Sequence, residues 1–178
     1  MKNIVVIYKS KYGSTKKYAK WISEHLNSDL FEASEIESKK LLKYDTIIFG
    51  GGLYASGISG VSLITKNFKS ISDKNIIVFT VGLAATEDKG IFKPIIEKNI
   101  PAEIRSSICY FHFRGGIDYS KLNTVHKAMM AMLKKMVAKK NPEEQTDEDR
   151  KMLQTYGDNV DFADEKSIDP LVTYVNNL

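Results

Sequence analysis

The chain has 178 residues, of which 43% are hydrophobic, and these values predict one domain with a sizeable buried core rather than two domains. Lys and Arg number 26 against 22 Asp and Glu, an excess too small to indicate a nucleic-acid partner. The single cysteine, Cys109, excludes an internal disulfide, and without neighbouring ligands it excludes a zinc or iron–sulfur site. We therefore expect no metal site, and we expect the protein to be located in the cytoplasm, which is reducing. There is no run of about 18 apolar residues to span a bilayer, and no basic and then apolar leader.

Short runs of β-forming residues recur along the first two thirds of the chain, each typical of a strand covered on both faces of a parallel sheet. They are residues 3–8, 46–49, 75–81 and 108–113, with a weaker run near 30–32. Helical patterns lie between them, at 14–27, 60–69 and 90–99, and Pro101 stops the last of these. Strands that alternate with such helices need crossover connections, so the sequence predicts an α/β fold with a doubly wound, five-stranded parallel sheet.

The pattern changes after the fifth predicted strand. Arg114-Gly115-Gly116 breaks it, and a long helix is predicted from about 121 to 140, a stretch that is rich in lysine and has no acidic residue. Pro142 and an acidic segment end that helix, and Asp169-Pro170 begins a short final helix. We expect a single domain, 1–178, with a core (1–113), an insertion (114–165) and a closing helix (166–178).

The turn between the first strand and its helix is a candidate phosphate loop. Its hydroxyl and amide groups lie at the positive end of a helix, and a glycine lets the backbone approach closely. The loop comprises Ser10, Lys11, Tyr12, Gly13, Ser14 and Thr15. It is neither a Walker loop nor the GxGxxG dinucleotide fingerprint. The alternative is an ordinary Ser/Gly turn with a serine cap.

Two further loops of small residues follow the third and fourth strands, at 50–57 and 82–86. Ligands of open parallel sheets lie at the carboxyl ends of the strands, where these loops are expected. A flat ring can lie against the main chain of such loops.

Over residues 1–113 the sequence resembles the flavodoxin family. The phosphate loop resembles the pattern Ser/Thr-x-Thr-Gly-x-Thr, with Tyr12 in place of the middle Thr. The resemblance implies FMN as cofactor, with the second and third loops on either side of the isoalloxazine. The residues it implies are Gly51, Gly52, Leu53, Tyr54, Ala55 and Gly57 on one side and Gly82, Leu83, Ala84, Ala85 and Thr86 on the other. Tyr54 is the only aromatic residue in either loop and is the candidate for ring stacking; the alternative is that it packs on the protein surface.

The layout after the fifth strand resembles the insertion of the menaquinone-dependent protoporphyrinogen dehydrogenase branch of this family. That resemblance implies an enzyme that passes electrons from a porphyrinogen to a quinone. The sequence pI of 8.9 and a third loop without an aromatic residue differ from the electron-carrying flavodoxins. The alternatives are a non-enzymatic carrier that serves a redox partner protein, and a scaffold that has lost its cofactor.

The predicted insertion helix has an apolar stripe on one face: Leu122, Val125, Met129, Met132, Leu133 and Met136. Lys127, Lys134 and Lys135 lie opposite. Residues 121–140 could therefore contact an anionic membrane at its inner face, or cover a porphyrin or quinone site with adaptable Met side chains. The alternative is that the stripe packs on the sheet or on a second copy in a homo-oligomer.

No set of catalytic side chains can be recognised, so the catalytic residues stay unknown. We interpret His25, His112 and His126 as structural and Cys109 as a buried small hydrophobe. Arg114, just past the fifth strand, is a candidate contact for a propionate or for reduced flavin; the alternative is a surface ion pair.

Overall fold

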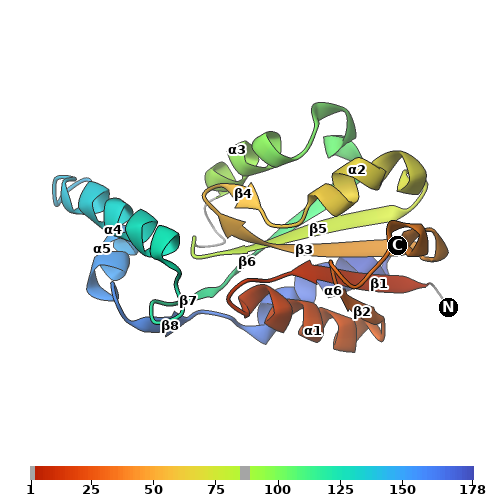
Figure 1. Cartoon of the computed structure of the whole chain (residues 1–178), viewed down its shortest axis with the longest axis horizontal. Coiled ribbons are helices and arrows are strands. Elements are labelled where there is room, and N and C mark those ends of the chain that lie inside the picture. The colour runs from red at the N-terminus through yellow and green to blue at the C-terminus, as the bar shows by residue number, and fades with distance from the viewer. Residues whose placement is uncertain (1–2, 85–88) are drawn as a thin grey trace.

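Five parallel strands form the centre of the structure, a computed structural model that describes residues 3–84 and 89–178 (Figure 1). Their spatial order is β2-β1-β3-β5-β6. The bounds are β1 Ile4–Lys9, β2 Asp29–Glu32, β3 Thr46–Tyr54, β5 Asn75–Gly82 and β6 Ile108–Arg114. The order reverses between β1 and β3, which confirms the predicted doubly wound sheet and makes this the switch point for ligand binding.

Helices cover both faces of the sheet, which explains why its strands are continuously apolar. α1 (Ser14–Leu26) and α6 (Asp169–Asn176) pack on one face around Tyr18 and Phe79. The other face carries α2 (Ser62–Ile71), α3 (Lys89–Asn99) and the 3₁₀ segments η1 (Ser38–Lys43) and η2 (Ala102–Ser107). Cys109, predicted to be a buried small hydrophobe, is half-buried and packs against the core on the first face of the sheet, that of α1 and α6.

Strand β3 is longer than predicted. The glycines at 50–52, which we assigned to a loop, continue the strand. A β-carbon at Gly50 would collide with the Phe79 ring on the neighbouring strand, so the strand needs glycine at this position. The chain then turns back through two residues into β4 (Gly57–Ile58), which pairs antiparallel with the end of β3. The second candidate loop is therefore a tight hairpin.

The chain leaves the sheet after β6 and forms a separate lobe, residues 116–161, beyond the carboxyl ends of the strands (Figure 1). A hairpin of β7 (Gly116–Asp118) and β8 (Asn159–Asp161) forms its base. Between these strands lie α4 (Thr124–Ala138) and α5 (Asp147–Gln154). The predicted insertion helix is thus present but shorter, whereas the hairpin and α5 were not predicted.

The final helix agrees with prediction, and the 3₁₀ turn η3 (Glu165–Ile168) precedes it. Asp169 is its first residue and Pro170 lies in its first turn. Amides in the first turn have no acceptor within the helix, so the missing amide proton of proline breaks no hydrogen bond there. No helix within residues 3–84 and 89–178 is long and apolar enough to cross a membrane.

Candidate functional site

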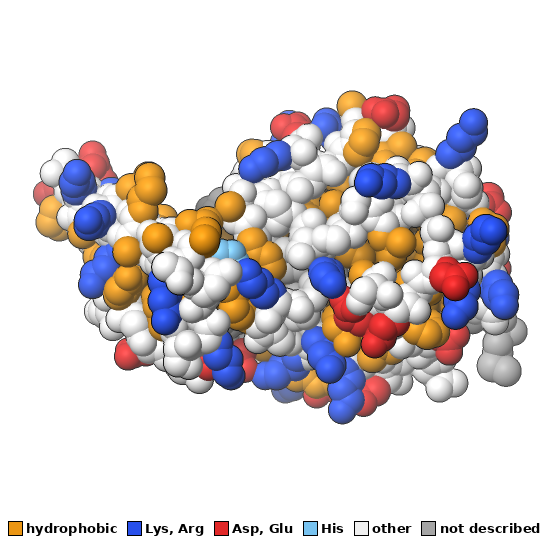
Figure 2. Space-filling model, in the orientation of Figure 1, with side chains coloured by type: hydrophobic (Ala, Val, Ile, Leu, Met, Phe, Trp, Pro, Cys, Tyr) orange, Lys and Arg blue, Asp and Glu red, His pale blue; other side chains and the backbone are white. Residues whose placement is uncertain are grey.

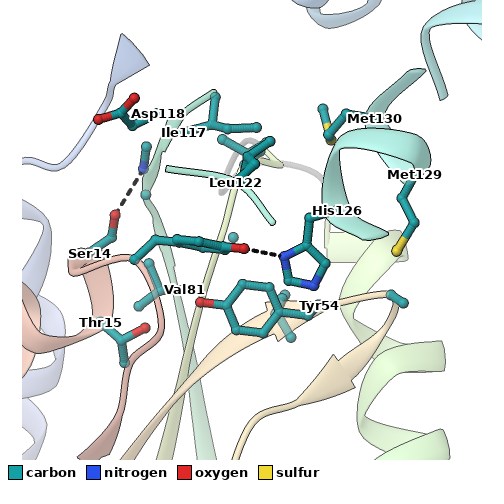
Figure 3. A pocket seen from close by; sticks show the side chains of 17 residues that line it. Ser14, Thr15, Tyr54, Val81, Ile117, Asp118, Leu122, His126, Met129 and Met130 are labelled. Carbon is teal, nitrogen blue, oxygen red and sulfur yellow. Dashed lines mark hydrogen bonds between the residues drawn. The ribbon is translucent and has the colours of Figure 1, made fainter. Parts of the chain in front are cut away.

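A cleft lies at the carboxyl ends of β1, β3 and β5, between the sheet and the lobe (Figure 3). Its cavity volume is about 150 Å³, and one side is open to solvent. Predicted site residues from all three candidate loops line it: Tyr12, Ser14, Thr15, Leu53, Tyr54, Ala55, Gly82 and Leu83. Three segments that are far apart in the sequence therefore meet in one place.

The candidate phosphate loop has a left-handed turn at Gly13, where φ is 103°, a conformation that glycine adopts without strain. The Gly13 amide donates to Ser10 Oγ (3.1 Å), so Ser10 stabilises the turn rather than lining the cleft. Gly13 is also the N-cap of α1, which excludes the alternative of a serine cap. The first intrahelical amide is that of Lys17 (3.0 Å to Gly13 O), so the amides of residues 14–16 have no partner within the helix.

The two hydroxyls at the start of α1 differ in their surroundings. Thr15 is only 2% exposed and lines the cleft, so its hydroxyl is a buried group at the positive end of the helix. Ser14 Oγ instead accepts a hydrogen bond from the Gly116 amide of the lobe (3.2 Å). The loop is thus joined to the base of the lobe.

Tyr12 joins the same loop to α4. Its hydroxyl lies 2.6 Å from His126 Nδ1 and accepts from the Asn123 amide (3.4 Å). Asn123 is the N-cap of α4, and its side-chain oxygen accepts from the His126 amide (2.8 Å). The residue that replaces the expected Thr therefore contacts the lobe.

The Tyr54 ring lies over the end of β3, where Gly52 has no side chain to obstruct it. It stacks on the His126 imidazole, with centroids 5.2 Å apart and planes 12° apart, and its other near neighbour is the Tyr12 ring at 5.8 Å. Burial raises the pKa of Tyr54 and lowers that of His126. At neutral pH the phenol therefore keeps its proton and the imidazole is uncharged.

The other predicted site residues that the structure describes lie outside the lining of the cleft. Gly51 and Gly52 lie within β3, and Gly57 begins β4. Lys11 places its ammonium 5.5 Å from the Tyr12 ring centroid. Ala84 follows the lining residue Leu83. Ala85 and Thr86, both predicted, lie outside the described residues.

Residues 5–145 match the family model of the flavodoxin domain. The chain belongs to that family. Among solved structures it is similar to a WrbA-like flavodoxin from Agrobacterium tumefaciens (19% identity, 63% of this chain and 83% of that chain, TM-score 0.42). It is also similar to flavodoxin 2 from Bacillus cereus (20%, 62% and 84%, 0.40). A putative flavoprotein from Bacteroides eggerthii matches at 13% identity over 79% and 100% of the two chains (0.44). No curated protein matches significantly.

Membership of the flavodoxin family implies a flavin cofactor, and the sheet order agrees with that family's fold. Within the described part of the chain, no group of three or more His, Cys, Asp or Glu side chains could hold a metal ion.

More than half of the cleft is lined by residues that sequence reasoning did not assign to a cofactor site. These are Val81, Gly115, Gly116, Ile117, Asp118, Leu122, His126, Met129 and Met130. The apolar stripe pointed to Leu122 and Met129, but His126 and Met130 lie on the neighbouring face of α4. Their proximity to the phosphate loop follows from how the lobe packs against the core, which no local pattern reveals.

His25 and Arg114 each pair with a glutamate side chain. His25 Nε2 lies 3.1 Å from Glu165 on the surface of α1. Arg114 forms an ion pair with Glu148 of α5, as the alternative reading of this residue expected. Its guanidinium also lies 4.0 Å from the Phe162 ring centroid.

The apolar stripe on α4 is largely exposed, so the alternative that it packs on the sheet is wrong. Val125, Met132 and Met136 are 64%, 65% and 58% exposed, whereas Leu122 is buried at 8%. Figure 2 shows apolar atoms along the side of the lobe that faces the hollow, with lysines around them. α4 instead packs through its other side, where Lys134 lies over the Tyr156 ring at 4.2 Å.

Proposed function

We propose that this flavodoxin domain binds FMN in the cleft. The phosphate lies at the amino end of α1, where the amides of residues 14–16 and the Thr15 hydroxyl act as donors. The flat ring lies between Leu53–Ala55 and the loop that begins at Gly82, against main chain and apolar side chains. When bound, the flavin supplies the redox chemistry, and the protein supplies binding and orientation.

One observation carries this proposal: a phosphate-type loop and two small-residue segments line the same cleft at the switch point of a doubly wound sheet. The donors suit an anion at one end, and the apolar lining suits a ring at the other. The chain's own residues thus fit a mononucleotide with a large flat base.

The experiment is a titration of the purified protein with FMN and, separately, with riboflavin, which has the same ring but no phosphate. We expect quenching of FMN fluorescence, a rise in Tm with FMN, and weaker binding of riboflavin. A protein that stays colourless in excess FMN, with an unchanged Tm, would contradict the proposal.

For the reaction, we propose the oxidation of a porphyrinogen with a quinone as the hydrogen acceptor, which becomes a quinol; the flavin, when bound in the cleft, would supply the redox chemistry. The support is the resemblance of the 114–165 layout to the protoporphyrinogen dehydrogenase branch, together with the apolar Leu122, Met129 and Met130 along the lobe side of the cleft. The alternative is an electron carrier for a redox partner protein, which is favoured by the open mouth of the cleft. Turnover of protoporphyrinogen with a quinone above the uncatalysed rate distinguishes the enzyme from the carrier.

We further propose that the exposed stripe of α4 contacts an anionic membrane surface at the inner face of the cell membrane. Val125, Met132 and Met136 supply the apolar contact. Lys135 lies three residues from Met132 along α4, and Lys139, the C-cap of α4, lies three residues from Met136. Residues at that spacing are neighbours on a helix surface, so Lys135 borders the stripe and does not lie opposite to it as predicted. A quinone acceptor would be met in the same membrane.

A further inference from the structure

Three successive carbonyl groups of the third loop, those of residues 82–84, are each bound by a group at the end of β6. The Gly115 amide donates to the first (2.7 Å) and Arg114 Nε donates to the second (3.2 Å). His112 Nε2 lies 3.3 Å from the third. The start of this loop is therefore held along one side by its neighbouring strand.

The partners of His112 determine which of its nitrogens carries the proton. The Ala84 carbonyl can only accept, so Nε2 must be the donor. Nδ1 then accepts from the Thr80 hydroxyl at 2.8 Å. Burial lowers the pKa of His112 to about 4, so the imidazole is neutral at pH 7. The Phe92 ring, 3.8 Å away between centroids, packs against it.

Holding the carbonyls also orients the amides. In a planar trans peptide the C=O of one residue and the N–H of the next point in opposite directions. Since the carbonyls of Gly82 and Leu83 point toward β6, the amides of Leu83 and Ala84 point away from it. That direction leads toward the β3 side of the loop, where Gly82 and Leu83 line the cleft opposite Leu53.

We infer that Arg114 and His112 are positioning residues that hold the Leu83 and Ala84 amides ready for the hydrogen-bond acceptors of a flat ring. The inference rests on the proposed function, under which those acceptors are the pyrimidine carbonyl oxygens of the flavin. Neither side chain lines the cleft, so both act through the loop backbone.

Arg114 also makes the loop depend on the lobe. Its guanidinium is shared between the Leu83 carbonyl, the Glu148 carboxylate of α5 and the face of Phe162. A planar, five-donor fork can satisfy a carbonyl and a carboxylate at once, and the point charge of a lysine cannot reproduce both. Glu148 therefore fixes the orientation in which Arg114 reaches the loop.

The test compares the binding of FMN and riboflavin to Arg114→Lys and His112→Asn, because both ligands carry the ring and only FMN carries the phosphate. We expect each variant to lose roughly tenfold in affinity for both ligands, leaving the ratio of the two affinities unchanged. The flavin reduction potential should also move in these variants. The matched control is Arg150→Lys, an exposed arginine of α5 paired with Asp147 away from the cleft. Unchanged riboflavin affinity in both variants, with Tm as in the wild type, would overturn the inference.

A second measurement examines the loop without any flavin. Imidazole ¹⁵N NMR of the flavin-free protein should show His112 protonated on Nε2 and accepting on Nδ1 from about pH 8 down to about pH 5. Protonation on Nδ1, or titration near the ordinary value of about 6.5, would overturn the role of His112. If the wild-type protein bound neither FMN nor riboflavin, the proposed function would be wrong. The NMR spectrum would still show whether His112 donates from Nε2 to the loop.

Discussion

The imidazole of His126 lies face to face with the ring of Tyr54, 5.2 Å away between centroids and tilted by 12°. His126 belongs to the lobe and Tyr54 to the end of β3, so this contact joins the lobe to the sheet across the cleft. The Tyr12 hydroxyl holds the imidazole in place at 2.6 Å. A flat ring that stacks on this face of Tyr54 must first displace His126.

We therefore expect His126→Ala to bind FMN faster and more tightly, by up to about tenfold, because an aromatic contact of about 0.5–1.5 kcal/mol no longer competes with the ligand. Stopped-flow fluorescence quenching and equilibrium titration measure the two effects. His25→Ala, which removes a surface imidazole paired with Glu165, is the matched control and should change neither. Weaker binding by His126→Ala would mean that the imidazole contributes to the ligand-bound site.

Thr15→Ala should weaken FMN binding by about 1 kcal/mol, since it removes a buried hydroxyl at the helix terminus that is proposed to donate to the phosphate. Riboflavin affinity should stay the same, because riboflavin has no phosphate. Thr173→Ala, an exposed threonine on α6, serves as control. Equal affinity of the variant and the wild type for FMN would show that the phosphate is bound elsewhere.

The β3–β4 turn holds two non-glycine residues in the left-handed region, Ala55 (φ 50°) and Ser56 (φ 62°). Each costs about 1 kcal/mol relative to glycine. We expect Ser56→Gly to raise the free energy of unfolding by up to about 1 kcal/mol, measured by urea denaturation. A decrease would mean that the entropy gained by the unfolded chain outweighs the relieved strain.

Asn99, at the end of α3, stabilises this turn from outside. Its Nδ2 donates to Ser56 O (2.7 Å) and its Oδ1 accepts from the Ile58 amide (2.9 Å). Asn99→Ala should lower the free energy of unfolding by about 2 kcal/mol, because it leaves the amide of the buried Ile58 without a partner and removes the bond to the exposed Ser56 carbonyl. Asn67→Ala loses a bond to Leu63 O within its own helix and should cost less. Equal losses in the two variants would contradict a special role for Asn99.

The exposed stripe of α4 predicts binding to vesicles that contain anionic lipid at low salt, with binding lost as ionic strength rises. Co-sedimentation measures it, with vesicles of zwitterionic lipid for comparison. Replacing Met132 and Met136 by Gln should reduce binding, whereas Leu42→Gln, which changes another exposed apolar residue on η1, should not. Indifference of the wild type to anionic vesicles at low salt would remove the membrane contact.

Local pattern was enough to predict the sheet and the position of the turn between β1 and α1 that we propose as the phosphate loop. Strand β5, for example, is buried on both faces, so its sequence is a continuous apolar run. α1 is buried on one face only, so its apolar residues recur at helical spacing. Gly13 marked a loop whose backbone can approach a ligand closely, and the structure adds that this glycine forms a left-handed turn. The order of these elements then placed the loop at the carboxyl end of the sheet.

The rest depended on contacts between distant segments. Gly50 suggested a loop, and only the Phe79 ring on the next strand explains why a strand needs glycine there. Tyr12 differs from the family pattern for a reason that becomes visible only when α4 is packed against the loop. The sequence by itself determined the fold and one side of the cleft. Tertiary structure alone decided the other side, because His126 and Arg114 take their roles from partners that local sequence spacing does not bring together.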